Sequence, residues 1–500
     1  MQSPWLNHLS SWNPQLVREL RGRLKTRSVM AAIALSVIGQ ILICLVQLQP
    51  AWGKSTQEQW LGIWSLITWL LPYLLFGLGS YYIVGDITQE EKRGTLNFIR
   101  LSPRPGWQIL LGKILGVPIL PYLTLATLIP LHIVSALAGQ VSLGFMVSYY
   151  VIILAGGGFC ASVALLYGLT SGGQLGIVGR QGTTAVSFGA IAFFILAPAF
   201  MAWNTGVTWR GFGPIGDLSQ GFSNTGILYW SYLPISDNLL LSHLFTLSTT
   251  ILAIGLLWRM VLRRFRQPRS TLMSKRQSYA WVAYLEILMV GFSLRPEPFS
   301  RGDWVGFAVI TYLLSAMMLL LLMLAIAPQR QALLDWSRYQ SKTLNSWLWA
   351  DKSPMLLAMV LHLIMVYSLL VPWTFLTGVS EENLVGAIIS FIGVANTLLI
   401  YGFCIQTILA GRFTNPIVWA IGGLIVWLIV PPAMLALLQL TPDNIPASTM
   451  LWTILGYPFF EWDNPVSLLF TQFGLIVQWG ILGVLIWWCD RTFKQLAKAS

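Results

Sequence analysis

The sequence predicts an all-α polytopic membrane protein, and three observations support this fold class. Of the 500 residues, 56% are hydrophobic and only 10% are charged, and the mean hydropathy is +0.68. A soluble protein of this length could not cover its surface with so few charged side chains. Apolar stretches of about 20 residues or more recur along the whole chain, and each can cross a hydrocarbon core of about 30 Å.

Twelve apolar stretches are candidate membrane spans. They are residues 29–49, 61–84, 109–138, 141–169, 183–203, 239–262, 279–294, 304–327, 355–376, 384–409, 416–440 and 467–489. The seventh is short and carries Glu286, so charge decides whether it is included. With twelve spans and both termini in the cytoplasm, only four basic residues lie outside the cytoplasm: Lys54, Arg210, Arg295 and Arg301. Omitting the seventh span would place the later basic segments outside, against the positive-inside rule.

The predicted organisation has four parts. Residues 1–28 form an amphipathic interfacial helix and residues 29–262 a first group of six spans. Residues 263–278 form a basic cytoplasmic linker, and residues 279–500 form a second group of six spans, with no internal repeat between the two groups. The net charge of +12 is explained by a basic cytoplasmic collar that attracts anionic lipid headgroups, so no nucleic-acid partner is expected.

The N-terminal segment carries the signals of a helix that lies in the headgroup layer. Asn13 can cap its first turn, and Pro14 suits its first helical position. Leucine and valine side chains recur on one side of this segment, opposite Arg18, Arg21 and further basic residues. A basic amphipathic helix of this kind lies parallel to the membrane surface.

Between the second and third spans lies one compact charged block, residues 88–102. Thr88 followed by Glu91 fits a capping box, which predicts that a helix begins there. The apolar side of the block consists of three residues: Leu96, Ile99 and Leu101. Two prolines and a glycine then end the helix abruptly. The sequence therefore predicts a short amphipathic helix at the cytoplasmic mouth of the bundle.

Two loops differ from the rest in composition. Residues 168–182 contain six glycines, and we expect a flexible cytoplasmic connection because neither a preceding strand nor the spacing of a phosphate-binding loop is present. Residues 204–237 are rich in aromatic side chains and glycine. That composition suits the outer membrane interface, where the segment can dip back into the bundle.

The chain offers little catalytic equipment. Residues 106–113 imitate a phosphate-binding loop, but the glycine spacing is wrong and Ile114 stands where Ser or Thr is needed. No cluster of His and Cys residues indicates a metal site, and the four scattered cysteines are interpreted as buried thiols. We therefore expect neither an enzyme nor a cofactor bound by this chain. Glu286 is the only carboxylate well inside a span, and it is either a proton or substrate site or a neutral or snorkelling side chain.

The charged block resembles the membrane domains of type-2 ATP-binding-cassette exporters. In that family, the segment after the second span is the coupling helix, which docks on the ATPase subunit. The resemblance covers about residues 13–262, with the motif Arg18-Glu19-Leu20, the block itself and the pair Gly112-Lys113. The coupling residues that it implies are Glu90, Glu91, Arg93, Gly94, Thr95 and Leu96. The residues that it implies for the interfacial helix are Arg18, Glu19 and Arg21.

The resemblance implies a permease subunit that exports its substrate and is driven by a separate ATPase subunit, which hydrolyses the ATP. It also implies pairing of permease subunits into a homodimer or heterodimer, in a bilayer such as the bacterial plasma membrane. Two alternatives remain open. A twelve-span ion-coupled secondary transporter would move substrate in an ion gradient without ATP. A membrane-embedded lipid-modifying enzyme would need a cluster of Asp, Glu or His residues near one interface.

Overall fold

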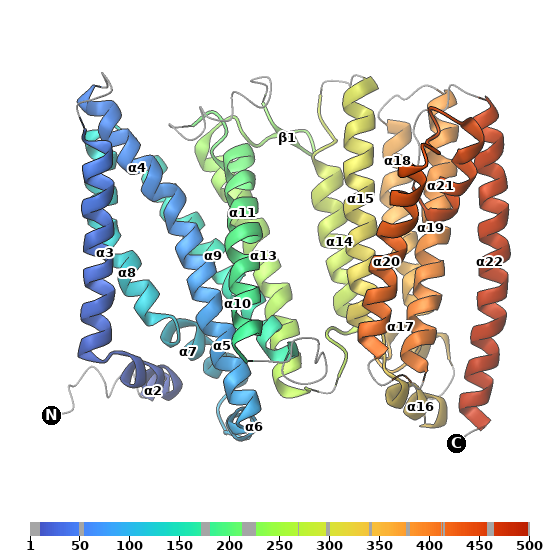
Figure 1. Cartoon of the computed structure of the whole chain (residues 1–500), viewed down its shortest axis with the longest axis horizontal. Helices are drawn as coiled ribbons and strands as arrows, with labels where there is room; N and C mark the ends of the chain where they lie inside the picture. The colour runs from blue at the N-terminus through green and yellow to red at the C-terminus, as the bar shows by residue number, and fades with distance from the viewer. Residues whose placement is uncertain are drawn as a thin grey trace. The chain divides into compact units, whose positions relative to one another are not determined.

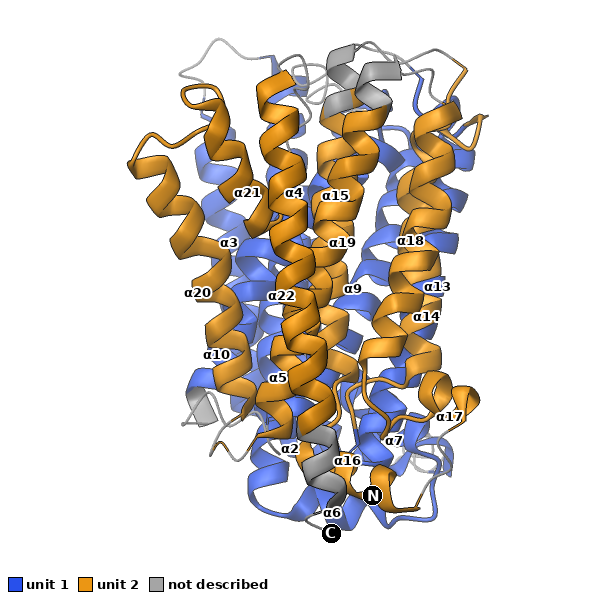
Figure 2. Cartoon of the chain, turned by 90° about the vertical axis from the view of Figure 1, so that its right-hand side faces the viewer, with its two compact units in different colours: residues 1–229, 234–270 blue, residues 230–233, 271–500 orange. Residues whose placement is uncertain are grey.

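The computed structural model describes residues 11–49, 55–171, 181–212, 227–268, 270–296, 301–339, 343–376, 381–411, 413, 416–457 and 465–498. The chain divides into two compact units (Figures 1 and 2). Unit 1 comprises residues 1–229 and 234–270, and unit 2 comprises residues 230–233 and 271–500.

Unit 1 is built from helices that run in sequence order. These are α2 (Pro14–Arg23), α3 (Thr26–Gln47), α4 (Thr56–Tyr73), η2 (Leu74–Leu78), α5 (Gly79–Lys92), α6 (Thr95–Arg100), α7 (Gly106–Gly116), α8 (Ile119–Ala138), α9 (Leu143–Ser171), α10 (Gln181–Ile191), η3 (Ala192–Leu196), α11 (Ala197–Trp203), η4 (Asn204–Thr208) and α13 (Leu239–Arg266). A short ribbon pairs β1 (Tyr229–Trp230) with β2 (Leu233–Pro234).

Unit 2 is also helical. Its helices are α14 (Lys275–Gly291), α15 (Arg301–Ile326), α16 (Arg330–Tyr339), α17 (Leu344–Trp349), α18 (Leu356–Leu376), α19 (Glu381–Ala410), α20 (Pro416–Leu437), η6 (Pro446–Ser448), α21 (Thr449–Leu455) and α22 (Pro465–Lys498).

Among the described residues, eleven helices are long and apolar enough to cross a membrane. The protein is therefore an all-α polytopic membrane protein. The expected seventh span, residues 279–294, corresponds to α14, which has 17 residues and is about 26 Å long at 1.5 Å per residue. It is slightly shorter than a typical hydrocarbon core. The expected third span, residues 109–138, is wrong at its start, because the chain turns between α7 and α8.

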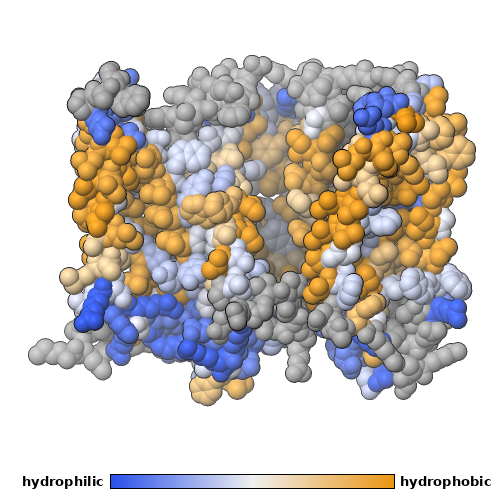
Figure 3. All heavy atoms as spheres, in the orientation of Figure 1, coloured by the Kyte–Doolittle hydropathy of each residue, from blue (hydrophilic) through white to orange (hydrophobic). Residues whose placement is uncertain are grey.

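Proline explains that turn. Pro118 has no N–H and cannot bond the carbonyl of Ile114, four residues earlier, so the helix cannot continue through it. The hydroxyl of Tyr122 donates to this carbonyl instead, at 3.0 Å. As a result, α7 separates from the membrane-crossing α8 and joins α2 and α6 at one end of unit 1 (Figure 1). Hydrophilic side chains gather at this end, below the apolar band that covers α3 (Figure 3).

The second span is longer than expected. The predicted span ended at residue 84, but one helical segment runs from Thr56 to Lys92, with a π-helical turn at η2 after Pro72. The helix therefore continues beyond the apolar stretch and carries its last two turns to the hydrophilic end of unit 1. Two predicted loops lie partly outside the described residues, namely residues 172–180 of the glycine-rich loop and residues 213–226 of the aromatic loop.

Candidate functional site

The charged block does not begin a new helix at Thr88, so that prediction is wrong. Thr88 lies inside α5, where it is 3% exposed, and its hydroxyl donates to the carbonyl of Val84 at 2.8 Å. A threonine that bonds back to the preceding turn satisfies its own hydroxyl and does not cap a helix start. The buried residues Ile83 and Ile87 keep this segment packed against the unit, so the helix continues to Lys92.

Gly94 ends the long helix and starts the next one. Its φ is +72°, a left-handed conformation that suits glycine, and α6 follows from Thr95 to Arg100. The Thr95 hydroxyl donates to the carbonyl of Glu90 at 3.2 Å across this break. The expected coupling helix, residues 88–102, is therefore the end of α5 followed by a separate helix of six residues.

The apolar residues of α6 lie on two opposite sides. Leu96 and Ile99 are one helical turn apart and are buried, at 0% and 9% exposure. Phe98 is 81% exposed and Leu101 is 84% exposed. The expectation that Leu101 shares the buried apolar side is therefore wrong. Figure 3 shows a hydrophobic patch over α6 at the hydrophilic end of unit 1, and Phe98 and Leu101 are its exposed apolar residues.

The N-terminal helix α2 packs on α7 through its polar cap. The Asn13 side chain accepts the N–H of Leu16 at 3.0 Å and donates to the carbonyl of Gln108 at 2.7 Å. The Gln108 amide in turn donates to the carbonyl of Trp12. Asn13 caps α2 and Pro14 is its first residue, as the sequence predicted. Asn13 thereby also fastens α2 to another helix.

Two glycines permit the close approach of α2 and α7. A Cβ on Gly112 would lie 2.6 Å from Asn13 Oδ1, and a Cβ on Gly116 would lie 2.7 Å from Glu19 Cβ. This spacing of two small residues, four apart, is a common device for close helix packing. Leu16 and Val17 are buried in this packing. These two apolar residues of α2 therefore face protein and not the lipid headgroups, contrary to the prediction.

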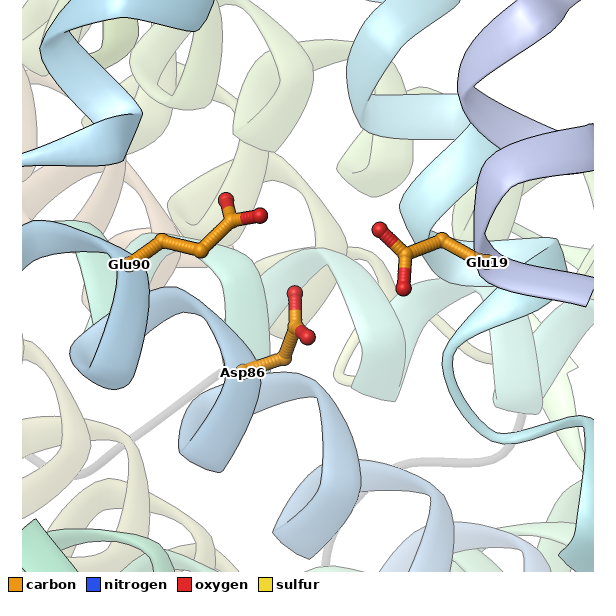
Figure 4. Close-up of side chains that lie close together, drawn as sticks. All are labelled: Glu19, Asp86 and Glu90. Carbon is orange, nitrogen blue, oxygen red and sulfur yellow. The ribbon is translucent and has the colours of Figure 1, made fainter. Parts of the chain in front are cut away.

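Six charged side chains join α2, α5 and α7. Three are carboxylates, Glu19, Asp86 and Glu90, which point toward one another from α2 and α5 (Figure 4). The other three are cations: Arg18, Arg23 and Lys113. Ion pairs join Arg18 to Glu90 at 2.6 Å, Arg23 to Asp86 at 2.6 Å and Arg18 to Glu19 at 3.0 Å. We call these six residues the charge network.

Lys113 lies at the centre of the charge network. Its side chain is 1% exposed, and its ammonium lies 2.6 Å from Asp86, 2.7 Å from Glu90 and 3.7 Å from Glu19. The three carboxylates are close enough to ligate one metal ion. Lys113 already fills that position, however, and three positive charges balance three negative ones. The chemistry of the network therefore requires no metal, and removing Lys113 would leave buried carboxylates uncompensated.

The remaining predicted coupling residues lie around this network. Glu91 forms an ion pair with Arg100 at 3.2 Å, and the Arg100 guanidinium lies 5.7 Å from the centre of the Phe265 ring in α13. Arg21 and Arg93 are exposed to solvent and lie outside the charge network. The structure therefore gives Glu90 and Glu91 internal partners, while the exposed surface is formed by Arg93, the α5–α6 break, Phe98 and Leu101.

Sequence reasoning missed part of this site. Asp86 and Arg23 were not among the predicted residues, and Lys113 was noted only for the family resemblance. One signal was available, because a lysine in the apolar helix Gly106–Gly116 needs carboxylate partners when it is buried. Phe98 could have been identified because it lies two residues from Leu96, on the opposite side of a helix.

Glu286 belongs to a different site, in α14 of unit 2. It is 0% exposed, and among the described residues neither of its carboxyl oxygens has a hydrogen-bond partner that meets geometric criteria. Ser315 of α15 is near, but its hydroxyl donates to the carbonyl of Thr311 at 2.8 Å. Tyr367 of α18 is also near, and its hydroxyl donates to the carbonyl of Phe391 at 2.8 Å.

Comparisons with protein-family models, with curated proteins and with solved structures found no match to this chain.

Proposed function

We propose that the chain is the permease subunit of an ATP-binding-cassette exporter and that a separate ATPase subunit docks on α6. The observation that carries this proposal is the exposed pair Phe98 and Leu101, on a short helix joined to the second span by one glycine. Two apolar side chains more than four-fifths exposed, beyond the membrane-crossing part of the helix, suit contact with another protein.

The charge network supports a mechanical role for this end of unit 1. Lys113 pairs with Asp86 and Glu90 and so ties α7 to α5, and Arg18 pairs with Glu90 and so ties α2 to α5. A force applied to α6 would therefore reach three membrane spans together: the second through α5, the third through α7 and the first through α2. Such a rigid connection suits a bundle that alternates between two openings.

The proposed docking site lies on the cytoplasmic face, where the positive-inside rule puts the basic end of unit 1. ATP is then bound and hydrolysed by the partner, and this chain binds no nucleotide. Glu90 and Glu91 orient α6 through their internal partners, Arg18, Lys113 and Arg100. Reversing both charges should therefore displace α6 without removing Phe98, so that ATP hydrolysis is uncoupled from transport while the complex persists.

The docking site can be tested with Phe98→Asp and Leu101→Asp, each placed in the full chain. We expect at least a tenfold loss of the ATPase subunit that co-purifies with the permease, because each change puts a charge into an apolar contact. Ile445→Asp, at a residue that is exposed in the turn after α20, is the matched control. Undiminished co-purification with both α6 variants, at normal membrane expression, would refute docking at α6.

Glu286 favours a second candidate function, a secondary transporter driven by protons. A buried carboxyl group without a hydrogen-bond partner is a natural proton-binding group in a membrane. Vesicles that contain the purified chain alone discriminate between the two functions. Substrate flux that follows a proton gradient without ATP would support the secondary transporter, and flux that requires the ATPase subunit and ATP would support the exporter.

A further inference from the structure

Unit 2 repeats the order of elements found in unit 1, although the sequences show no repeat. In unit 1, the second span is followed by the short helix α6, and the fifth span by the irregular outer segment before α13. In unit 2, the second long helix, α15, is followed by the short helices α16 and α17, and the fifth, α20, by η6 and α21 before α22. Both units thus contain six long helices with extra elements after the second and the fifth.

The packing of the helices within each unit follows the same pattern. In unit 1, the first span α3 packs on the third, α8, and so does the second span, α4. In unit 2, α14 and α15 pack on α18 in the same way. The second span also packs on the fourth in both units, through α5 and α9 in unit 1 and through α15 and α19 in unit 2.

The fourth span packs on the sixth in both units, as α9 on α13 and as α19 on α22. Tyrosine hydroxyls join the second and fourth spans in each unit. Tyr149 donates to the carbonyl of Thr68 at 2.7 Å, and Tyr312 donates to the carbonyl of Ser390 at 2.8 Å. The two bonds run in opposite directions, so they maintain the same helix contact with unrelated residues. A repeat of this kind leaves no trace in sequence comparison.

The segment after the second span of unit 2 has the same character as α6. Leu333 and Trp336 of α16 are buried, whereas Tyr339 is 81% exposed and Leu344 of α17 is 75% exposed. The Trp336 indole donates to the hydroxyl of Ser346 at 3.1 Å and so joins the two helices. Like α6, the pair therefore has one side packed in its unit and exposed apolar residues elsewhere.

Lys275 fixes this segment to the first helix of unit 2. Its ammonium donates to the carbonyl of Trp347 at 2.7 Å, the hydroxyl of Ser353 at 2.5 Å and the carbonyl of Pro354 at 2.9 Å. Burial lowers the pKa of Lys275 to about 8, and the nearby Asp351 carboxylate acts in the opposite direction. Met273 N–H also bonds the carbonyl of Ala325 at 3.4 Å, which places the end of α15 at the same end of unit 2.

Chain length places this end of unit 2 on the membrane face that carries α6. Phe265, at the end of α13, lies against Gly106 and below the Arg100 guanidinium of α6. Only eight residues, 267–274, connect α13 to α14. Eight fully extended residues reach about 28 Å, which is too short to cross a hydrocarbon core of about 30 Å together with its headgroups.

We propose that unit 2 is a second permease module and that α16–α17, residues 330–349, dock a second ATPase subunit. One chain then supplies both halves of the permease, and no second copy of the chain is needed. This proposal rests on the proposed function of α6, because it assigns to α16–α17 the same kind of partner. The equivalent position in the repeat and the exposed Tyr339 and Leu344 commit the segment to that partner.

Cysteine cross-linking separates this proposal from the proposed function. Phe98→Cys, Leu344→Cys and the control Leu35→Cys, on the exposed face of α3, are each made in the full chain and treated with a bis-maleimide in the ATPase complex. The chain with its natural cysteines gives the background. We expect cross-links to the ATPase from positions 98 and 344 and none above background from position 35. We also expect native mass spectrometry to show one chain with two ATPase subunits.

Each other outcome overturns a different statement. Cross-linking from position 98 alone, with two chains and two ATPase subunits per complex, would overturn the second docking site and leave the proposed function intact. The absence of any ATPase cross-link or complex would overturn the proposed function itself.

Discussion

The two units solve one problem, the placement of a buried charge, in opposite ways. In unit 1, three carboxylates surround Lys113, and each has a cationic partner. In unit 2, Lys275 donates to two backbone carbonyls and a hydroxyl, and the carboxyl group of Glu286 has no hydrogen-bond partner among the described residues. Ion pairs between helices fix their relative positions in unit 1, whereas Lys275 of unit 2 holds one connecting segment in place.

This difference indicates which parts of the molecule transmit force. The charge network links three separate helices, so displacing one of them moves the others or breaks paired buried charges, which is costly. The hydrogen bonds of Lys275 hold only the segment between α17 and α18. We therefore expect unit 1 to depend strongly on single charges and unit 2 to depend on them less.

The largest effect is expected from Lys113→Met. Its loss leaves three part-buried carboxylates without their central cation, at a cost of about 3–5 kcal/mol. We expect a strongly lowered thermal unfolding midpoint in detergent, or loss of the folded protein. Partial recovery in the double variant Lys113→Met/Asp86→Asn would identify charge compensation as the cause. An unchanged midpoint in Lys113→Met would break the comparison between the units.

Lys275→Met sharpens the same comparison. It removes three donated hydrogen bonds and leaves three acceptors without this donor, so we expect a loss of about 1–3 kcal/mol, smaller than at Lys113. The exposed pair Lys352–Asp335, at 3.0 Å, is the control, and Lys352→Met should cost less than about 1 kcal/mol. A larger loss at Lys275 than at Lys113 would reverse the assignment of the rigid connection to unit 1.

Gly116→Ala tests the contact between α2 and α7. The added methyl group would lie 2.7 Å from Glu19 Cβ, and we expect a loss of about 1–3 kcal/mol from overpacking. Gly39→Ala in α3 is the matched control, because no atom lies within 4 Å of its added Cβ. Equal unfolding midpoints for the two variants would show that α2 is not held against α7.

The smallest effect is expected from Glu286→Gln. The amide has almost the same shape as a neutral carboxyl group, and no described partner depends on a negative charge at this position. We expect expression and ATP-dependent transport to stay close to the natural level. Complete loss of transport in a well-expressed variant would instead make Glu286 essential and favour the proton-driven alternative.

Sequence reasoning predicted the membrane spans better than the contacts between them. Apolar length identified the long helices, because crossing a bilayer is a property of one continuous stretch. Thr88 was misassigned because the pattern of Thr followed by Glu three residues later occurs both at helix starts and inside helices. The packing of each residue decides between these, and Ile83 and Ile87 keep Thr88 inside α5.

The charge network and the repeat could not be read from local patterns. Glu19, Asp86 and Lys113 come from three helices that are distant in sequence, and only the fold brings them together. The repeated order of helices in unit 2 needs only apolar spans of suitable length, so it places no demand on residue identity. Gly112 and Gly116 did carry a readable signal, because their spacing is typical of closely packed helices.

The central claim is that an ATPase subunit acts on the spans through α6, and hydrogen–deuterium exchange tests it most directly. The full chain is compared with and without the co-purified ATPase, and exchange is followed in peptides that cover residues 95–101. A six-residue helix with Phe98 and Leu101 exposed should exchange rapidly alone, and bound ATPase should slow this exchange at least tenfold. Unchanged exchange at residues 95–101 in an intact complex would contradict the claim.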